Sequence, residues 1–420
     1  MADMPSVADV VRQLAREGSK HRLGEPRTMP KPHPEWRKIR NAGTALWLDT
    51  GDMDEARGLW NAEFEALTTN NTLLNKEVQK GIYDTLVGRA AAAIKAAAPD
   101  TDDETLVLEI SFVLNAYHAL RLVEQFDAHV SVELHTALAG DVERTIAYGR
   151  RYHEICPQRF YVKIPFTPAG LLGARKLAKA NVPINLTLGF SARQNYLAAL
   201  FAQPKYVNVF MGRLNAVVSD NLLGDGRNVG EKATLATQRE LLALRRGGRT
   251  MTLLIGASMR DGSQVASLAG VDVFTMPPKV VSQFQQRPVA SVTPQVGRNP
   301  IVTANAGIKM TDFAAPTLWD VPKPFKDAVE TLLRQDADRM APEDIVSHFE
   351  MAGLHDLFPR WPAEAIEAVV ADGKIPVYAR WSEALASGAV GLDALMNLSA
   401  LYSFVSDQKA LDDRIRSVLA

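Results

Sequence analysis

Lys163 is the residue in this sequence whose surroundings most clearly indicate chemistry. It lies in an apolar, β-rich run from 159 to 166, directly between Val162 and Ile164. Burying an ammonium group is costly, so a lysine inside a buried parallel strand needs an explanation. One explanation is structural: the lysine lies near a strand end and extends its charged group to solvent. The other is chemical: a desolvated, neutral amine can form a Schiff base with a carbonyl.

Other polar residues stand at or just after the ends of further β-rich runs. They are Asp49, Asn70, Glu133, Asn185, Thr187, Asn208, Arg213, Ser258 and Arg260. Each alone has a structural interpretation, because acids after strands are usually helix caps and Asn is a common turn residue. Taken together with Lys163, they combine a nucleophile, acids and cations, which is the combination expected of an active site.

Schiff-base chemistry gives each of these side chains a task. Dehydration of the carbinolamine needs a proton shuttle, which Glu133 and a water held by Thr187 could provide. Cleavage of the carbon–carbon bond next to the iminium needs a base for the C4 hydroxyl proton, and Asp49 could serve. Arg213 and Arg260, with Ser258, could bind a phosphate at the far end of the substrate.

The elements that must position these residues alternate along the chain. The β-rich runs are 45–49, 64–70, 129–134, 159–166, 182–188, 206–211, 251–258 and 271–276. Helical stretches lie between them; Asp52 with Glu55 predicts a capping box, and a long helix is predicted over 72–98. Eight such units in about 230 residues are typical of an α/β fold of the (β/α)8 TIM-barrel class, in which strand carboxyl ends share one face. An open doubly wound sheet is disfavoured because no Gly-x-Gly-x-x-Gly turn follows the first run.

The chain is predicted to have three regions. Residues 1–43 form an N-terminal arm or cap, 44–290 the barrel, and 291–420 a mostly helical C-terminal extension. A connector over 286–324, rich in Pro, Gly and Asn, separates the barrel from the helices of the extension. We interpret the extension as a lid or a contact to a second subunit, so a homo-oligomer is one expectation.

Composition narrows the classes of function. The 420 residues are 47% hydrophobic and 23% charged, with a formal net charge of −1, so no global field favours nucleic acid or an anionic membrane. Cys156 is the only cysteine, which excludes an intrachain disulfide and fits a cytoplasmic setting. The N-terminal 40 residues lack an apolar signal core, and no uninterrupted apolar run reaches membrane-spanning length. The eight His residues include no HxH or HxxxH pair, so metal-assisted aldol chemistry fits poorly.

An ordered set of motifs resembles the transaldolase family of class I aldolase barrels. The matching stretches are Leu48-Asp49-Thr50 with Asp52, Thr68-Thr69-Asn70, Val130-Ser131-Val132-Glu133, Val162-Lys163-Ile164-Pro165, Asn185-Leu186-Thr187-Leu188-Gly189-Phe190-Ser191, Gly212-Arg213 and Gly256-Ala257-Ser258-Met259-Arg260. They occur in the family's order and cover roughly residues 44 to 285, the length expected of the barrel. No single motif decides the resemblance; the ordered set does.

The resemblance implies roles and partners. Lys163 matches the Schiff-base lysine, Asp49 the acid that handles the C4 hydroxyl, and Glu133 with Thr187 the pair that holds the catalytic water. The remaining matches contact substrate: Asn70 and Asn185 the dihydroxyacetone unit, and Arg213, Ser258 and Arg260 the phosphate. The implied reaction moves a dihydroxyacetone unit from a ketose phosphate of the sedoheptulose 7-phosphate type to glyceraldehyde 3-phosphate, as in the pentose phosphate pathway. Sugar phosphates are the implied partners, and neither a metal nor an organic cofactor is implied.

Departures from the family pattern keep other functions open. Asn71 stands where similar proteins usually have Pro, and Asn208 where they usually have Ser, beside the bound dihydroxyacetone moiety. Phe210 replaces the Tyr of the related fructose-6-phosphate aldolases, and Glu133 their Gln, which favours transfer over simple cleavage. The alternatives are a class I aldolase or transaldolase-like enzyme for another sugar, and a non-catalytic barrel that binds sugar phosphates.

Overall fold

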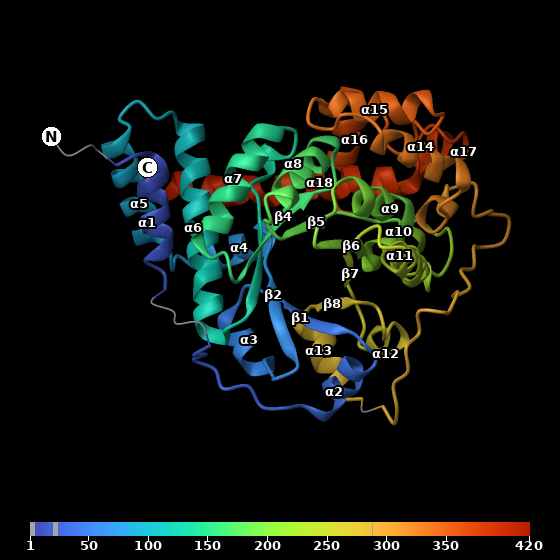
Figure 1. Cartoon of the computed structure of the whole chain (residues 1–420), viewed down its shortest axis with the longest axis horizontal. Coiled ribbons are helices and arrows are strands. Elements are labelled where there is room, and N and C mark those ends of the chain that lie inside the picture. The colour runs from blue at the N-terminus through green and yellow to red at the C-terminus, as the bar shows by residue number, and fades with distance from the viewer. Residues whose placement is uncertain (1–4, 20–23, 288) are drawn as a thin grey trace.

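Eight parallel strands close into one barrel, which confirms the predicted fold class (Figure 1). The computed structural model describes residues 5–19, 24–287 and 289–420. The strands are β1 (Ala45–Asp49), β2 (Phe64–Thr68), β3 (His129–Glu133), β4 (Phe160–Pro165), β5 (Ile184–Thr187), β6 (Tyr206–Phe210), β7 (Leu253–Ala257) and β8 (Val273–Met276). They are hydrogen-bonded in sequence order, and β8 pairs with β1 to complete the ring.

Helices surround this ring and connect its strands. Those after β1 and β3 to β8 are α3 (Met53–Leu59), α7 (Val142–Ile155), α8 (Pro168–Lys179), α9 (Ala192–Phe201), α10 (Met211–Asp220), α11 (Val229–Arg246), α12 (Ser263–Ser267) and α13 (Pro278–Gln285). Between β2 and β3 lie α4 (Asn71–Val78), α5 (Asp84–Ala97) and α6 (Asp103–Phe126), and before β1 lie α1 (Val7–Arg16) and α2 (Pro34–Asn41). The division of the chain at residues 43 and 290 stays a prediction.

The single helix predicted over 72–98 is wrong, because two helices occupy this stretch. Residues 79–83 form a turn between α4 and α5, and Gly81 has a φ of 76° within it. A right-handed helix cannot continue through a residue in this left-handed region, where glycine carries no steric penalty. The break lets α4 follow the end of β2, while α5 packs beside α6 and α1.

Aromatic side chains fill the barrel interior at the amino ends of the strands. Trp47 on β1 stacks on Tyr161 of β4 with ring centres 5.5 Å apart, and meets Tyr206 of β6 edge-on at 4.7 Å. These strands are not neighbours in the sheet, so their side chains can meet only across the interior. Because alternate residues of a strand point to the same side, Tyr161 on the inside also places Lys163 on the inside, one layer nearer the carboxyl ends.

The C-terminal helices pack against the barrel rather than standing apart from it. They are α14 (Lys323–Leu333), α15 (Pro342–Met351), α16 (Ala363–Asp372), α17 (Tyr378–Ala386) and α18 (Leu392–Leu419), preceded by a short 3-10 helix, η2 (Ala315–Leu318). The first two contact α9 and α8, respectively. In Figure 1 the long red α18 crosses behind the barrel from α16 toward α5, and it contacts α4, α5 and α6.

A buried ion cluster fixes the start of α18 to the barrel. Asp393 is fully buried and accepts hydrogen bonds from Arg193 of α9 at 2.6 and 2.8 Å and from the Ser191 hydroxyl at 2.6 Å. Arg193 also pairs with Asp356 at 2.8 Å. Burial lowers the pKa of Arg193, but its two carboxylate partners more than offset this, so the pKa lies above its ordinary value. The guanidinium therefore stays charged, and losing a partner would leave a buried charge undercompensated.

Replacing Asp393 by Ala is expected to lower the free energy of unfolding by about 3 kcal/mol, the lower end for a broken buried pair, because Asp356 still faces Arg193. The matched control is Asp327→Ala, which breaks only the exposed pair between Lys323 and Asp327 and should leave stability unchanged. Chemical denaturation of both variants measures the difference. Equal stability of the two variants would show that the cluster does not anchor α18.

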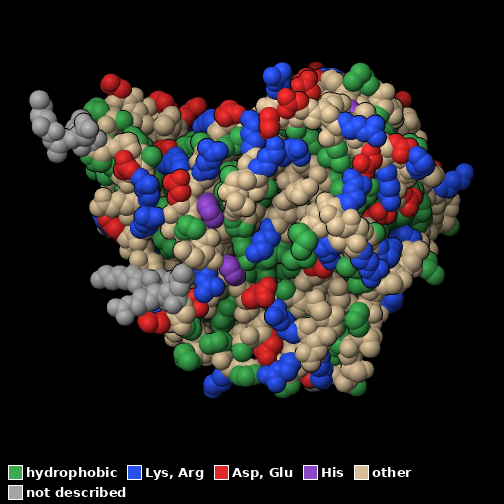
Figure 2. All heavy atoms as spheres, in the orientation of Figure 1, with side chains coloured by type: hydrophobic (Ala, Val, Ile, Leu, Met, Phe, Trp, Pro, Cys, Tyr) green, Lys and Arg blue, Asp and Glu red, His purple; other side chains and the backbone are tan. Residues whose placement is uncertain are grey.

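The distribution of surface charge and the packing of α6 agree with a compact barrel. Basic and acidic side chains are interspersed on the face shown in Figure 2. Among the described residues, α6 is long and apolar enough to cross a membrane, but 89% of its apolar window is buried inside the protein. It is therefore packed as a core helix, between β3 on one side and α1 and α5 on the other.

Candidate active site

Lys163 lies inside the barrel, where its strand register brings it beside two other candidate residues. It pairs with Glu133 of β3 on one side and with Asn185 of β5 on the other. Only 5% of the residue is exposed, so its amine does not extend to bulk solvent. The Nζ atom lies 3.7 Å from Oε1 of Glu133. The structural interpretation of Lys163 as a solvent-reaching side chain is therefore wrong.

Glu133 is a buried carboxyl between a cation and a backbone donor. Burial raises its pKa above the ordinary value, while the charge of Lys163 and the backbone N–H of Asn71 act in the opposite direction. That N–H donates to Oε2 at 3.3 Å. A raised pKa favours the protonated carboxyl, the form that can give a proton.

Thr187 ends β5 with a hydroxyl oxygen that is buried and has no hydrogen-bond partner in the structure. A buried polar atom without a partner costs free energy unless a water or a ligand satisfies it. Thr187 lies opposite Pro165, two residues beyond Lys163 on β4. Its hydroxyl therefore offers the kind of anchor that the predicted water needs.

Asp49 is held by hydroxyl groups from the two strands that flank β1. The Thr68 hydroxyl donates to its Oδ1 at 2.6 Å, and the hydroxyls of Thr68 and Thr275 lie 2.6 Å apart. Since β2 and β8 are not neighbours, this second contact spans the interior. The chain of hydroxyls fixes the direction in which the Asp49 carboxylate points.

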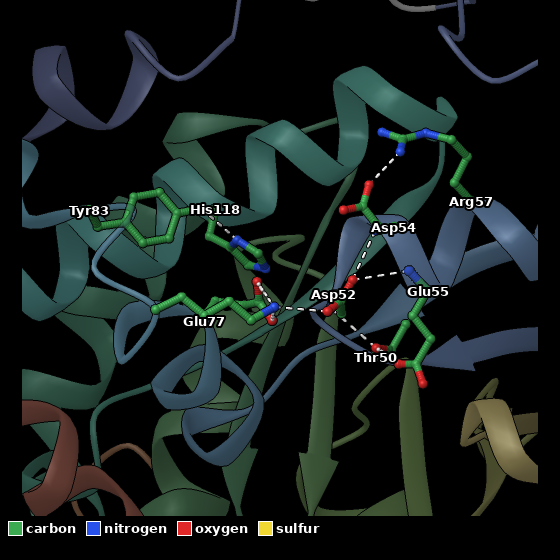
Figure 3. A network of polar contacts seen from close by, with 9 residues as sticks. Thr50, Asp52, Asp54, Glu55, Arg57, Glu77, Tyr83 and His118 are labelled. Atoms are coloured by element: carbon green, nitrogen blue, oxygen red, sulfur yellow. Dashed lines mark hydrogen bonds and ion pairs between the residues drawn. The ribbon is translucent and has the colours of Figure 1, made fainter.

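The loop after β1 is fixed by a polar network (Figure 3). Asp52 caps α3 by accepting hydrogen bonds from backbone N–H groups of its first turn, as predicted. Glu55 does not complete the predicted capping box, because its carboxylate accepts from the Thr50 hydroxyl at 2.8 Å instead. Lys80 from the turn after α4 donates to Asp52 at 2.8 Å and lowers the pKa of that carboxyl. These contacts hold the segment that follows Asp49.

Asparagine amides form a polar layer next to Lys163. The Asn185 amide donates to the Ser131 hydroxyl at 3.0 Å, and Asn208 donates to Oδ1 of Asn185 at 3.1 Å. Oδ1 of Asn208 is buried and has no partner, which leaves an acceptor for a substrate hydroxyl. Asn70 is the N-cap of α4 and accepts from the backbone of Leu73 at 2.8 Å. Part of its side chain is therefore used for structure.

Two arginines approach each other at the carboxyl ends of β6 and β7. A Cβ atom at Gly212 would lie 2.1 Å from the carbonyl oxygen of Ser258 and 2.8 Å from the side chain of Arg260, so only glycine allows this approach. Ser258 itself has a φ of 62° in the tight loop after β7. Burial and then the charge of Arg260 lower the pKa of Arg213 to about 10, with Asp407 acting in the opposite direction. One terminal nitrogen of Arg213 is buried without a hydrogen-bond partner, as expected of a cation that awaits an anion.

These groups open onto one cavity of about 170 Å³. The predicted residues that line it are Asp49, Asn70, Lys163, Asn185, Asn208, Phe210, Arg213, Ser258 and Arg260. Glu133 and Thr187 lie behind this lining, buried in the barrel wall. The structure thus brings the predicted side chains to one place, with Glu133 and Thr187 set back from the surface of the cavity.

Residues of the C-terminal extension also line the cavity, and sequence reasoning missed them. Phe404 of α18 lies with its ring centre 5.8 Å from Nζ of Lys163 and 5.7 Å from the guanidinium of Arg213. Lys374, between α16 and α17, lines the same cavity. No sequence motif marks either residue, because a helical pattern does not show which barrel face a distant helix will cover.

Comparison with known proteins identifies the family. The model of the transaldolase/fructose-6-phosphate aldolase family matches residues 46–335, more than half of the chain. The chain belongs to the transaldolase/fructose-6-phosphate aldolase family. It is 29% identical over 245 residues to the transaldolase of Xanthomonas euvesicatoria pv. vesicatoria, which is 56% of this chain and 73% of the relative. It is 32% identical over 251 residues to a probable transaldolase of Thermus thermophilus, which is 59% of this chain and 93% of the relative.

Membership of this family makes the chain an enzyme, and its relatives' names place it with the transaldolases, a class of transferase. The family match includes every strand of the barrel except Ala45, the first residue of β1. It ends at residue 335, directly after α14, so α15 to α18 lie beyond it. Lys374 and Phe404 are therefore cavity residues that the family match does not include.

Proposed function

We propose that this enzyme transfers a dihydroxyacetone unit from a ketose phosphate of the sedoheptulose 7-phosphate type to glyceraldehyde 3-phosphate through a Schiff base on Lys163. One observation carries the proposal: a buried lysine amine faces a cavity, 3.7 Å from a carboxyl whose pKa is raised by burial. The cation pair of Arg213 and Arg260 at the edge of that cavity supports a phosphorylated substrate. Such substrates place the reaction in pentose phosphate metabolism.

The first half of the reaction forms the Schiff base and cleaves the donor. The neutral Lys163 amine attacks the C2 carbonyl, and Glu133, through a water held by Thr187, gives the proton with which the carbinolamine hydroxyl leaves as water. Asp49 then takes the proton of the C4 hydroxyl, and the bond between C3 and C4 breaks. Its electron pair moves to the iminium, which becomes an enamine, and the shortened aldose leaves.

The second half reverses these steps on another aldehyde. The enamine carbon attacks the carbonyl of glyceraldehyde 3-phosphate, and Asp49 returns its proton to the new C4 oxygen. Hydrolysis of the Schiff base releases the new ketose. Phe210, which lines the cavity, has no hydroxyl that could protonate the enamine, so the enamine is expected to persist until an acceptor binds.

Borohydride trapping tests the Schiff base. Incubation with sedoheptulose 7-phosphate and sodium borohydride reduces the iminium and should leave a sugar adduct on the peptide that contains Lys163, detectable by peptide mass analysis. Supplying the donor with and without glyceraldehyde 3-phosphate tests transfer: turnover should require the acceptor. Absence of the adduct would refute the Schiff base, and release of free dihydroxyacetone at a comparable rate without acceptor would identify an aldolase instead.

A further inference from the structure

The C-terminal extension forms one wall of the active-site cavity. Phe404 of α18 is 6% exposed and lies between Lys163 and Arg213, close to both. Thr72, at the start of α4, donates from its hydroxyl to Asp407, one turn further along α18. The extension therefore contacts the interior of the site as well as the outside of the barrel.

The turn that carries Lys374 is held in a defined place. Gly373 ends α16 with φ 78° and ψ −136°, a backbone conformation that glycine adopts without steric penalty. The hydroxyl of Ser399 on α18 donates to the carbonyl oxygen of Gly373 at 3.0 Å, and the amide of Asn221 donates to that of Pro376 at 2.9 Å. Asn221 is the C-cap of α10, the helix whose first turn contains Arg213. The turn is thus tied both to α18 and to the helix that presents Arg213.

Three of the cations that line the cavity have no carboxylate partner among the described residues. In the part of the chain that the structure describes, none of Arg213, Arg260 and Lys374 forms an ion pair within 4.0 Å, whereas Lys163 in the same cavity pairs with Glu133. Asp407 is the carboxylate that counteracts the lowered pKa of Arg213. Like charges facing one cavity repel each other, so they favour the binding of an anion with several negative charges.

We propose that Lys374 is a specificity-determining residue that binds the terminal phosphate of the substrate together with Arg213 and Arg260. The inference rests on the proposed function and extends its phosphate subsite to a segment beyond the family match. Arg213 is 8% exposed and binds from inside the barrel, whereas Lys374 lines the cavity with an exposed side chain and closes the subsite from the solvent side. A lysine suits this position because its ammonium group is a flexible point charge that can follow a phosphate as it enters.

Replacing Lys374 by Ala tests the proposal. The KM for sedoheptulose 7-phosphate should rise about 10-fold, the low end for a hydrogen bond to a charged group. The kcat/KM for unphosphorylated sedoheptulose should stay within about 2-fold, because that sugar has no group for the ammonium to bind. Lys374→Arg should keep most of the affinity for sedoheptulose 7-phosphate, because it keeps the positive charge. Lys409→Ala is the matched control: it removes an exposed lysine of the same extension that pairs with Asp413 on α18.

Calorimetric titration with inorganic phosphate measures the affinity of the phosphate subsite independently of Schiff-base chemistry. Phosphate should bind about 10-fold more weakly to the K374A variant than to the wild type or to K409A. Unchanged phosphate affinity and unchanged KM for the phosphorylated donor would overturn the inference. An equal loss of kcat/KM with sedoheptulose 7-phosphate and with sedoheptulose would also overturn it. A wild-type enzyme that gives no borohydride adduct would instead refute the proposed function, and the phosphate titration would still decide the role of Lys374.

Discussion

Replacing Lys163 by Met is expected to lower kcat/KM for dihydroxyacetone transfer by at least about 10⁴-fold, because the variant has no amine with which to form the covalent intermediate. The methionine side chain has a similar length and suits a buried position. Glu133 then loses the charge that lowers its pKa, so its neutral form is favoured over an unpaired buried carboxylate. Steady-state rates with sedoheptulose 7-phosphate and glyceraldehyde 3-phosphate measure the effect.

The matched control for this variant is Lys205→Met, at the opposite end of the same barrel. The Lys205 amine lies 3.3 Å from the hydroxyl of Tyr161, in the aromatic layer below the site, and does not line the cavity. K205M should keep both activity and the borohydride adduct, whereas K163M should lose both and keep its melting temperature within a few degrees. Retention of more than about 1% of the activity by a folded K163M enzyme would contradict the covalent mechanism.

The fold and the inward-facing candidates could be predicted because their signals are local. Period-2 alternation places Tyr161 and Lys163 on one side of β4, and a ring of parallel strands brings the carboxyl ends together whatever the details of the loops. Asp49, Glu133 and Asn185 therefore meet around Lys163 as expected.

What could not be predicted depends on contacts between distant segments. In the sequence, Phe404 is one of many apolar residues in a long helix, and nothing shows that this helix covers the barrel. Asp393 has the pattern of an ordinary acid in a first helical turn, although it is fully buried against Arg193. The break between α4 and α5 had a visible signal in Gly81, but the alanine-rich sequence after it favours an uninterrupted helix. The helix propensity of the alanine-rich sequence does not decide the structure at this point, because α4 and α5 pack separately against α18, and α5 also packs against α6.

Replacing Glu133 by Gln is expected to lower kcat by about 10²- to 10⁴-fold, the range for loss of a positioned proton-transfer group. Glutamine keeps the shape of the side chain and can still accept from the Asn71 N–H, so the loss should fall on proton transfer rather than on folding. Single-turnover borohydride trapping measures the step directly, since adduct formation on Lys163 should slow in parallel with kcat. A variant with normal trapping kinetics would show that Glu133 does not move the proton.

Asn71→Pro provides a finer test of the same carboxyl, because it removes the N–H that donates to Glu133. The site accepts proline: residue 71 is the first residue of α4, and Asn70 before it is extended, with φ −157° and ψ 173°. Burial raises the pKa of Glu133 and this N–H lowers it, so its loss raises the pKa further. Glu133 gives a proton in Schiff-base formation, so the alkaline limb of the kcat/KM profile, where the carboxyl loses that proton, should move to higher pH.

The control is Asn71→Ala, which keeps the backbone N–H and removes only the side-chain amide that donates to the carbonyl oxygen of Leu134 at 3.4 Å. Its alkaline limb should stay where the wild type has it. A shift of the limb in both variants would assign the effect to the amide side chain. A shift in neither variant would show that Glu133 does not carry out the rate-controlling proton transfer. The predicted pattern, a shift with proline alone, would mean that Asn71, where similar proteins usually have Pro, sets the working pH of this enzyme through one backbone hydrogen bond.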